Sequence, residues 1–178
     1  MFFYNMGMYF DNFIFLNCKS MIRMKINIKP VFQEDSRMLA EMKALAREKS
    51  ICVLATVAGR KPHCSLMAYV TDENCTEMYL VTHKNTNKYK NLMENPSVSL
   101  LVDTREISPR SKAKALTVAG VCAAIENEEK RNKVQAELLA VHPHLAEFIN
   151  HSEAEILCVQ IHSFLLLNGL QEAHFQSV

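Results

Sequence analysis

The segment with the clearest chemical potential is Thr82–Lys90 (THKNTNKYK), where an apolar run ends and a polar turn leads into a helical pattern. Thr86, Asn87 and Lys88 fall in the first turn of that predicted helix. The first N–H groups of a helix have no partner within it and carry partial positive charge, so they bind phosphate groups readily. A hydroxyl and an ammonium add a donor and a charge. The spacing is typical of a phosphate site, although threonine-capped, lysine-rich helix starts are also common without a ligand.

No other segment carries a recognisable catalytic motif. The sequence has no P-loop, GxGxxG, GxSxG or HExxH pattern. His142 and His144 flank Pro143, and His142 and His151 share no helical face with a carboxylate at ligand spacing, so no metal site is expected. The six cysteines form no CxxC pair, and most lie in apolar runs. This usage favours a reducing cytoplasm over a disulfide framework.

Composition limits the class of protein. The chain has 178 residues, of which 49% are hydrophobic and 22% charged, with a formal net charge of +1. This is the size of one domain with a real core, and the apolar fraction is too high for a disordered chain. A net charge near zero gives no bulk attraction to nucleic acid or to an anionic membrane, so neither partner is expected. Any bound anion must therefore be held by a local site.

The N-terminal residues 1–20 differ from the rest of the chain, because they hold seven of its fourteen Phe and Tyr residues. Their apolar stretch is too short and too interrupted for a transmembrane helix, and it lacks the basic start and cleavage site of a secretory signal. Two interpretations stay open: a genuine extension, or a native translation start at Met21 or Met24. We expect an N-terminal extension over 1–24 and a single domain over 25–178.

Hydrophobic periodicity then predicts the elements of that domain. Helical patterns cover 35–48, 83–95 and 127–150, the last with a break at Pro143. Strand patterns cover 51–58, 63–71, 77–82, 97–103, 114–126 and 155–169. Gly120 lies inside the fifth strand and predicts a bend or bulge. The short turns between the first three strands are typical of an antiparallel meander. The fold class is therefore α+β: six mostly antiparallel strands, two to four helices, and a small closed barrel that removes exposed edges.

Two stretches carry a resemblance to a known family. They are ATVAGRKPHCSLMAYV from Ala55, and EMYLVTHKNTNKYKNLMENPSVSLLV, which ends at Val102. Their pattern is a Gly turn and Pro before one strand, a strand ending in Thr, a Ser/Thr-x-Lys helix start, Asn-Leu, Asn-Pro and the strand VSLLV. It closely resembles the FMN-binding split barrel of the pyridoxamine 5′-phosphate oxidase-like superfamily. The order of strands and helices fits that split barrel as far as Gly169.

The resemblance implies a set of FMN-binding residues on three neighbouring segments. Four lie on the second strand and would line the flavin ring and ribityl chain, largely through the backbone. Three end the third strand and would touch the ring edge or the ribityl-phosphate, and two begin the helix and would hold the phosphate. In chain order these nine residues are Cys64, Ser65, Leu66, Met67, Val81, Thr82, His83, Asn87 and Lys88.

The resemblance also implies a homodimer with two FMN sites at its interface. Each site would be completed by the partner chain, with Lys114 or Leu116 of the fifth strand as candidates. Ser65 stands where the family often has a basic phosphate ligand, which leaves Lys88 as the main positive charge. Oxidases of pyridoxamine phosphate keep basic residues and a Trp near the C-terminus. This chain has no Trp, and its end offers only His174, so oxidation of that substrate is not expected.

The sequence thus predicts an FMN-binding flavoprotein that acts as an oxidoreductase, exchanging electrons with an unidentified small donor or acceptor. His83 either donates to the flavin or a substrate, or is a loop histidine at the helix start. The alternative function is an FMN- or heme-binding protein without turnover, in which His63 and His83 would be candidate axial ligands and Met67 a softer one. The deazaflavin F420 is bound by the same kind of barrel, but no feature here favours it.

Overall fold

The computed structural model describes residues 31–105, 112–169 and 172–178. The extension expected over 1–24, the alternative starts at Met21 and Met24, and the domain boundary at residue 25 all lie outside the described residues.

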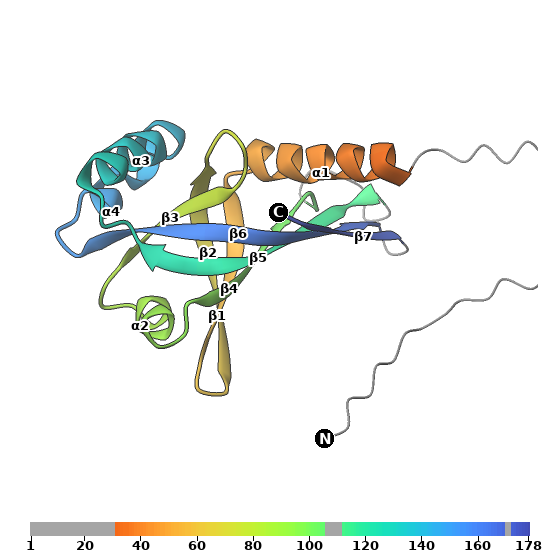
Figure 1. The fold of residues 1–178 in the computed structure, drawn as a ribbon. Helices are drawn as coiled ribbons and strands as arrows, with labels where there is room; N and C mark the ends of the chain where they lie inside the picture. Colours follow the sequence, from red (N-terminus) through yellow and green to blue (C-terminus); the bar gives the residue numbers. More distant parts are fainter. Residues whose placement is uncertain (1–30, 106–111, 170–171) are drawn as a thin grey trace, which may run out of the picture.

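The described strands form one antiparallel sheet that closes into a barrel (Figure 1). Six strands close because the first strand in the sheet order β3-β2-β1-β4-β5-β6-β7 also pairs with the sixth, β6. Closure leaves few unpaired edges, as the sequence analysis expects. The bounds are β1 Ile51–Ala58, β2 Lys61–Thr71, β3 Glu77–His83, β4 Ser97–Asp103, β5 Lys114–Ala124, β6 Ala154–Asn168 and β7 Glu172–Ser177.

The long strand β6 joins the closed and open parts of the sheet. One edge of β6 pairs with β5 along its length, while the other pairs first with β3 and then with β7. The β5–β6 register shifts between Ala119 and Gly120, which confirms the irregularity predicted at this glycine. A Cβ atom on Gly120 would lie 2.2 Å from the Gln160 carbonyl oxygen. No other residue type fits there without moving the backbone of β6.

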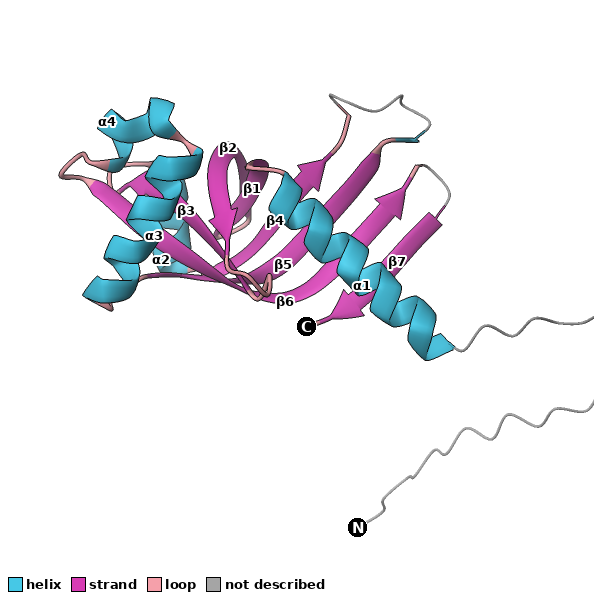
Figure 2. Cartoon of the chain, turned by 90° about the horizontal axis from the view of Figure 1, so that it is seen from above, coloured by secondary structure: helices cyan, strands magenta, loops and turns pink. Residues whose placement is uncertain are grey.

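The helices cover different sides of the barrel. α1 lies on one side of the sheet and α2 on the other, with α3 and α4 together where β6 begins (Figure 1). Seen from above, α1 runs across the strands toward β7 (Figure 2). Their bounds are α1 Val31–Glu48, α2 Asn87–Glu94, α3 Glu128–Val141 and α4 Ala146–Ile149, and a short 3₁₀ turn covers Pro143–Leu145. No helix in the described part of the chain combines the length and apolar composition that crossing a bilayer needs.

Two apolar cores hold these elements together. The first fills the barrel with fully buried side chains such as Leu54, Leu100 and Phe164, and α1 contributes Met42 and Ala46 to it. The second lies between α3, α4 and the outer side of β2, β3 and β6. Its members are Val70, Tyr79, Val81, Ile125, Val134, Leu138, Ile149 and Ile156. The outer face of β3 is therefore covered by helices, whereas its inner face belongs to the barrel.

The six predicted strands are all present, and the structure adds β7. This strand escapes the pattern analysis because Glu172–Ser177 is short and has no run of apolar residues. The helix expected over 83–95 begins at Asn87, because Thr86 is its N-cap in an extended conformation and residues before it form a turn.

Candidate functional site

The barrel wall is split between β2 and β3. These strands pair only through Tyr69–Thr71 and Met78–Leu80. Within the described chain, β2 residues 61–68 pair with β1 alone, and β3 residues 81–83 pair with β6 alone. The facing edges therefore diverge toward the start of β2 and the end of β3, which leaves backbone groups there for another partner. Because α2 follows β3 after a short turn, its N-terminus lies at the same split.

The β2 residues assigned to FMN divide between two faces of the strand. Ser65 and Met67 share the side of the buried Tyr69, which faces the barrel interior. Cys64 and Leu66 point to the outer face, where Leu66 is 75% exposed. Ser65 and Met67 are thus the side chains that face the split from inside, and the other two serve such a site only through their backbone.

The end of β3 contributes a buried hydroxyl. Thr82 is fully buried, and its Oγ1 lies 3.0 Å from Oγ1 of Thr86, the N-cap of α2. Val81 is 4% exposed and packs in the second core against α3. Only the main chain of Val81 is therefore available at the split, whereas Thr82 links the strand end to the helix start.

His83 connects this strand end to α4. Its ring stacks on Phe148 with a centroid distance of 3.9 Å and on His151 at 4.8 Å. Its Nε2–H donates a hydrogen bond to the Phe148 carbonyl oxygen at 3.1 Å. The His83 carbonyl accepts hydrogen bonds from the backbone N–H of Thr86 at 3.1 Å and from its hydroxyl at 2.8 Å. The ring is thus a tertiary contact, and the backbone of His83 shapes the start of α2.

The first turn of α2 holds an uncompensated cation. Lys88 is partly buried, and this burial lowers the pKa of its ammonium group. Among the described residues no carboxylate forms an ion pair with Lys88, and the turn contains no acidic residue. Neighbouring Lys84 instead pairs with Glu155 at 2.9 Å. Asn87 is exposed at the first helical position. The turn therefore presents positive charge together with the unpaired N–H groups of a helix start.

Contacts to the β1–β2 hairpin fix the orientation of α2. The Asn91 side-chain amide donates to Thr56 Oγ1 at 3.1 Å, and Glu94 accepts from the Gly59 N–H at 2.9 Å. Leu92 is buried between them in the barrel core. The sequence predicts no supporting contact for Asn91 or Glu94, although Asn91 and Leu92 form the Asn-Leu pair of the pattern. Asn91 and Glu94 lie about one helical turn apart on either side of the buried leucine, and this spacing is the sequence signal that could identify them as contacts to the hairpin.

Of the other candidate residues, only His63 lies beside the split. Leu116 is fully buried inside the barrel, so it is not placed to complete a site on a partner chain. Lys114 forms an ion pair with Glu41 of α1. His63 lies on the same side of β2 as Ser65, with its Nδ1 3.3 Å from the Ser65 hydroxyl. His142 is buried, and its Nε2–H donates to the Tyr69 carbonyl at 3.1 Å.

No group of three His, Cys, Asp or Glu side chains in the described ranges is arranged to hold a metal ion. The chemistry of the split therefore lies in an ammonium group, the N–H groups of a helix start and unpaired strand edges, which suit a ligand that carries an anionic group.

A six-stranded antiparallel barrel opened beside a threonine-capped helix is a split barrel. The chain belongs to the pyridoxamine 5′-phosphate oxidase family, whose family model matches residues 38–164. No curated protein matches the sequence.

Solved structures share the fold at low sequence identity. One is described as a heme binding protein from Mycobacterium smegmatis, with a TM-score of 0.69 and 18% identity over 78% of this chain and 57% of that protein. A putative pyridoxamine 5′-phosphate oxidase from Listeria innocua has a TM-score of 0.60 and 18% identity over 74% of this chain and 98% of its own. A FAD-binding protein from Mesorhizobium loti has a TM-score of 0.61 and 14% identity over 71% and 91%.

Proposed function

We propose that this protein binds FMN at the split between β2 and β3 and acts as an oxidoreductase on a small substrate. The observation that carries the proposal is Lys88: a partly buried ammonium without a carboxylate partner in the described chain, in the first turn of a helix. Burial has removed part of its hydration without supplying a counter-charge. A bound phosphate would supply that charge together with acceptors for the helix N–H groups.

The residues around the split fit the parts of FMN. Lys88 and the N–H groups of the first turn would bind the phosphate, and the Thr82–Thr86 hydroxyl pair lies next to that turn. The unpaired edge of β2 would meet the polar edge of the ring, with Ser65 and Met67 facing it from the inner side. When bound, FMN supplies the electron transfer, while the chain anchors the phosphate and sets the surroundings of the ring.

We propose that the protein acts as a homodimer, because the outer barrel face presents an apolar row. The row follows the strand register across six strands, and its ends are highly exposed, Leu66 at 75% and Phe175 at 62%. Its apolar members are Leu66, Val53, Leu101, Leu165 and Phe175, and the polar Thr117 interrupts the row between Leu101 and Leu165. The residues between these ends are half-buried, so the exposed apolar surface is concentrated at Leu66 and Phe175. Exposed apolar side chains of this size are typical of interaction sites, and a second copy with the same surface is the simplest partner.

Heme is the second candidate cofactor, since one structural neighbour is described as a heme binding protein. The geometry favours it less, because His83 would have to leave its stack on Phe148 and give up the hydrogen bond of Nε2 to ligate iron. Oxidation of pyridoxamine phosphate is not part of the proposal. His174, the candidate for that substrate at the C-terminal end of the sequence, lies on β7 opposite Leu166. A cytoplasmic location agrees with the five described cysteines, which are all free.

Replacing the unpaired ammonium tests the proposal. Lys88→Ala should weaken FMN binding about ten- to hundredfold, because a charge-assisted contact to phosphate is lost. Titrating the protein into FMN and following the quenching of flavin fluorescence measures this affinity. Lys90→Ala is the matched control, since Lys90 is exposed in the same helix but beyond its first turn. Equal FMN affinity in the wild type and Lys88→Ala would refute the proposed phosphate site.

A further inference from the structure

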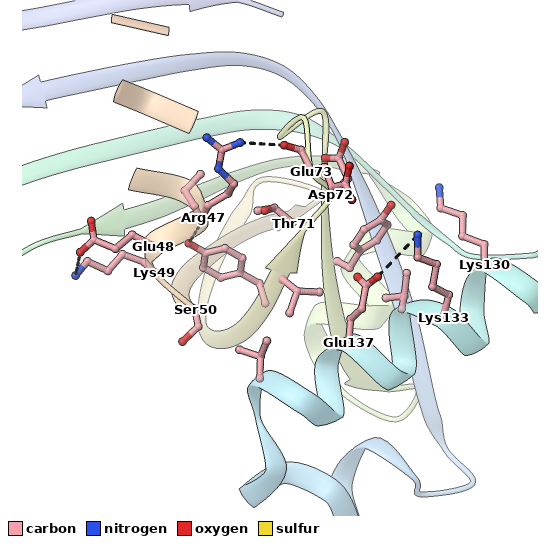
Figure 3. A pocket seen from close by; sticks show the side chains of 16 residues that line it. Arg47, Glu48, Lys49, Ser50, Thr71, Asp72, Glu73, Lys130, Lys133 and Glu137 are labelled. Atoms are coloured by element: carbon pink, nitrogen blue, oxygen red, sulfur yellow. Dashed lines mark hydrogen bonds and ion pairs between the residues drawn. The ribbon is translucent and has the colours of Figure 1, made fainter. Parts of the chain in front are cut away.

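We propose that this protein has a second ligand site, for a small aromatic carboxylate or sulfonate, in the cavity between the end of α1, the β2–β3 turn and α3. The cavity measures about 820 Å³, which is within the range of small-molecule sites (Figure 3). Arg47 and Ser50 come from the α1 side, Asp72 and Glu73 from the turn, and Lys133 from α3. The cavity lies at the end of β2 and the start of β3, so it is separate from the split and does not rest on FMN binding.

The floor of the cavity is apolar and rigid. Tyr69 is fully buried, and its hydroxyl donates to the Ala46 carbonyl at 2.8 Å. Tyr79 and Val134 are 6% and 2% exposed and belong to the second core. Val141 reaches the surface at 51% exposure and lines the same cavity. Because Tyr69, Tyr79 and Val134 are almost inaccessible, the apolar surface that a ligand ring would cover is that of Val141.

The carboxylates around the cavity are largely engaged. Asp72 accepts hydrogen bonds from the N–H groups of Asn74, Thr76 and Glu77 and from the Thr76 hydroxyl, so it stabilises its own turn. Glu48 forms an ion pair with Lys49 at 3.3 Å. These acids are therefore poor partners for a further cation.

On the opposite wall, Glu137 lies 4.0 Å from Lys133, an exposed and long ion pair. Lys130 is held by Glu77, whose two oxygens each accept from its ammonium group at 2.9 Å. Lys133 is therefore the α3 cation that can turn toward a bound anion.

Arg47 supplies the anchoring charge. Its Nη1 donates to the Glu73 carbonyl oxygen at 2.9 Å, which fixes the guanidinium at the cavity rim. No described carboxylate forms an ion pair with Arg47. The remaining donors of a guanidinium form a planar fork that matches a carboxylate or sulfonate. These charges favour an anion bound at Arg47, with Lys133 across the cavity. The carboxylate of Glu73 opposes such binding.

The probe for this site is 8-anilino-1-naphthalenesulfonate, an aromatic anion whose fluorescence rises in an apolar site. We expect saturable binding to the full-length protein, and shifts of the ¹H–¹⁵N signals of residues 46–50, 69–73 and 133–141. Arg47→Gln should weaken this binding about tenfold, whereas Arg131→Gln on α3, which does not line the cavity, should leave it unchanged. Glu73→Gln should bind the probe at least as tightly as the wild type.

The outcomes that overturn the proposal are equally specific. Unchanged affinity in Arg47→Gln, signal shifts confined to the outer barrel face, or weaker binding in Glu73→Gln would each contradict it. Displacement of the probe by FMN would show that it occupies the split instead. Because FMN binding is measured separately, failure at this cavity and failure at the split are distinguishable.

Discussion

At the residue scale, the site depends on which charges have partners. Lys84 and Lys88 are four residues apart, yet Glu155 neutralises the first while the second has no described carboxylate partner. The sequence predicts the location of Lys88 in the first helical turn correctly, because a threonine cap and a lysine two residues later are local features. It does not predict which of the two lysines is paired. The partner of Lys84, Glu155, comes from a strand more than sixty residues further along the chain.

The sequence does not show which β2 side chains face the split. The resemblance assigns Cys64, Ser65, Leu66 and Met67 as one run, but side chains alternate along a strand. The structure gives two of them to the inner face and two to the outer. Which face of β2 is the inner one depends on barrel closure by β3 and β6, and no local sequence pattern carries that information.

Glu77 provides a pH-dependent prediction. Partial burial opposes its ionisation, but hydrogen bonds from Tyr79, Lys130 and Gln160 outweigh burial and lower the pKa of Glu77 from 4.5 to about 2. A lowered pKa in the folded state stabilises the fold above about pH 4.5, and this contribution is lost as the pH falls toward 2.

Urea denaturation at pH 6 and at pH 3 measures this effect. At pH 6, Glu77→Gln should lower the free energy of unfolding by about 1–2 kcal/mol, a value discounted for partial exposure. At pH 3 the difference from the wild type should shrink. A difference that is the same at both pH values would rule out the ionised network as its source.

At the element scale, strands bounded by breakers are predicted best. β1 and β4 match their predicted bounds because each is a β-branched, apolar run that ends at a turn or begins after Pro96. β7 is missed because its residues alternate weakly and it exists only by pairing with β6. The α1–α3 cavity is likewise beyond sequence reasoning, since it forms where three elements distant in the chain meet.

The bulge in β5 gives the prediction at this scale. Gly120→Ala should lower the free energy of unfolding by about 2–3 kcal/mol, because the added Cβ would lie 2.2 Å from the backbone oxygen of Gln160. Ala123→Ser, at an exposed position of the same strand, should change it by less than about 0.5 kcal/mol. Thermal and urea denaturation followed by circular dichroism measure both. Wild-type stability of Gly120→Ala would mean that β5 and β6 are not in this close contact.

At the scale of the whole molecule, the apolar row on the outer barrel face is the feature that the proposed homodimer would cover. The row crosses six strands in register, so it is a consequence of strand pairing and is not visible in any one segment. The sequence predicts the homodimer only by resemblance, and it names Leu116, which the barrel buries. The proposed interface lies instead on residues such as Leu66 and Phe175.

Leu66→Asp should therefore prevent the proposed dimer from forming, because it places a charge at the most exposed apolar side chain of the row. Sedimentation velocity at several concentrations measures the change. Met93→Asp is the control, since Met93 is 54% exposed on α2, away from the row. A wild type that sediments as a monomer throughout, or a Leu66→Asp protein that stays dimeric, would argue against this interface.

The measurement that tests the central claim most directly is the visible spectrum of the full-length protein after mixing with FMN and passage through a desalting column. We expect retained flavin absorption bands at about one FMN per chain, reduced to a trace in Lys88→Ala and kept in Lys90→Ala. A colourless wild-type protein would contradict the assignment of FMN to the split, as would equal retention of flavin by Lys88→Ala.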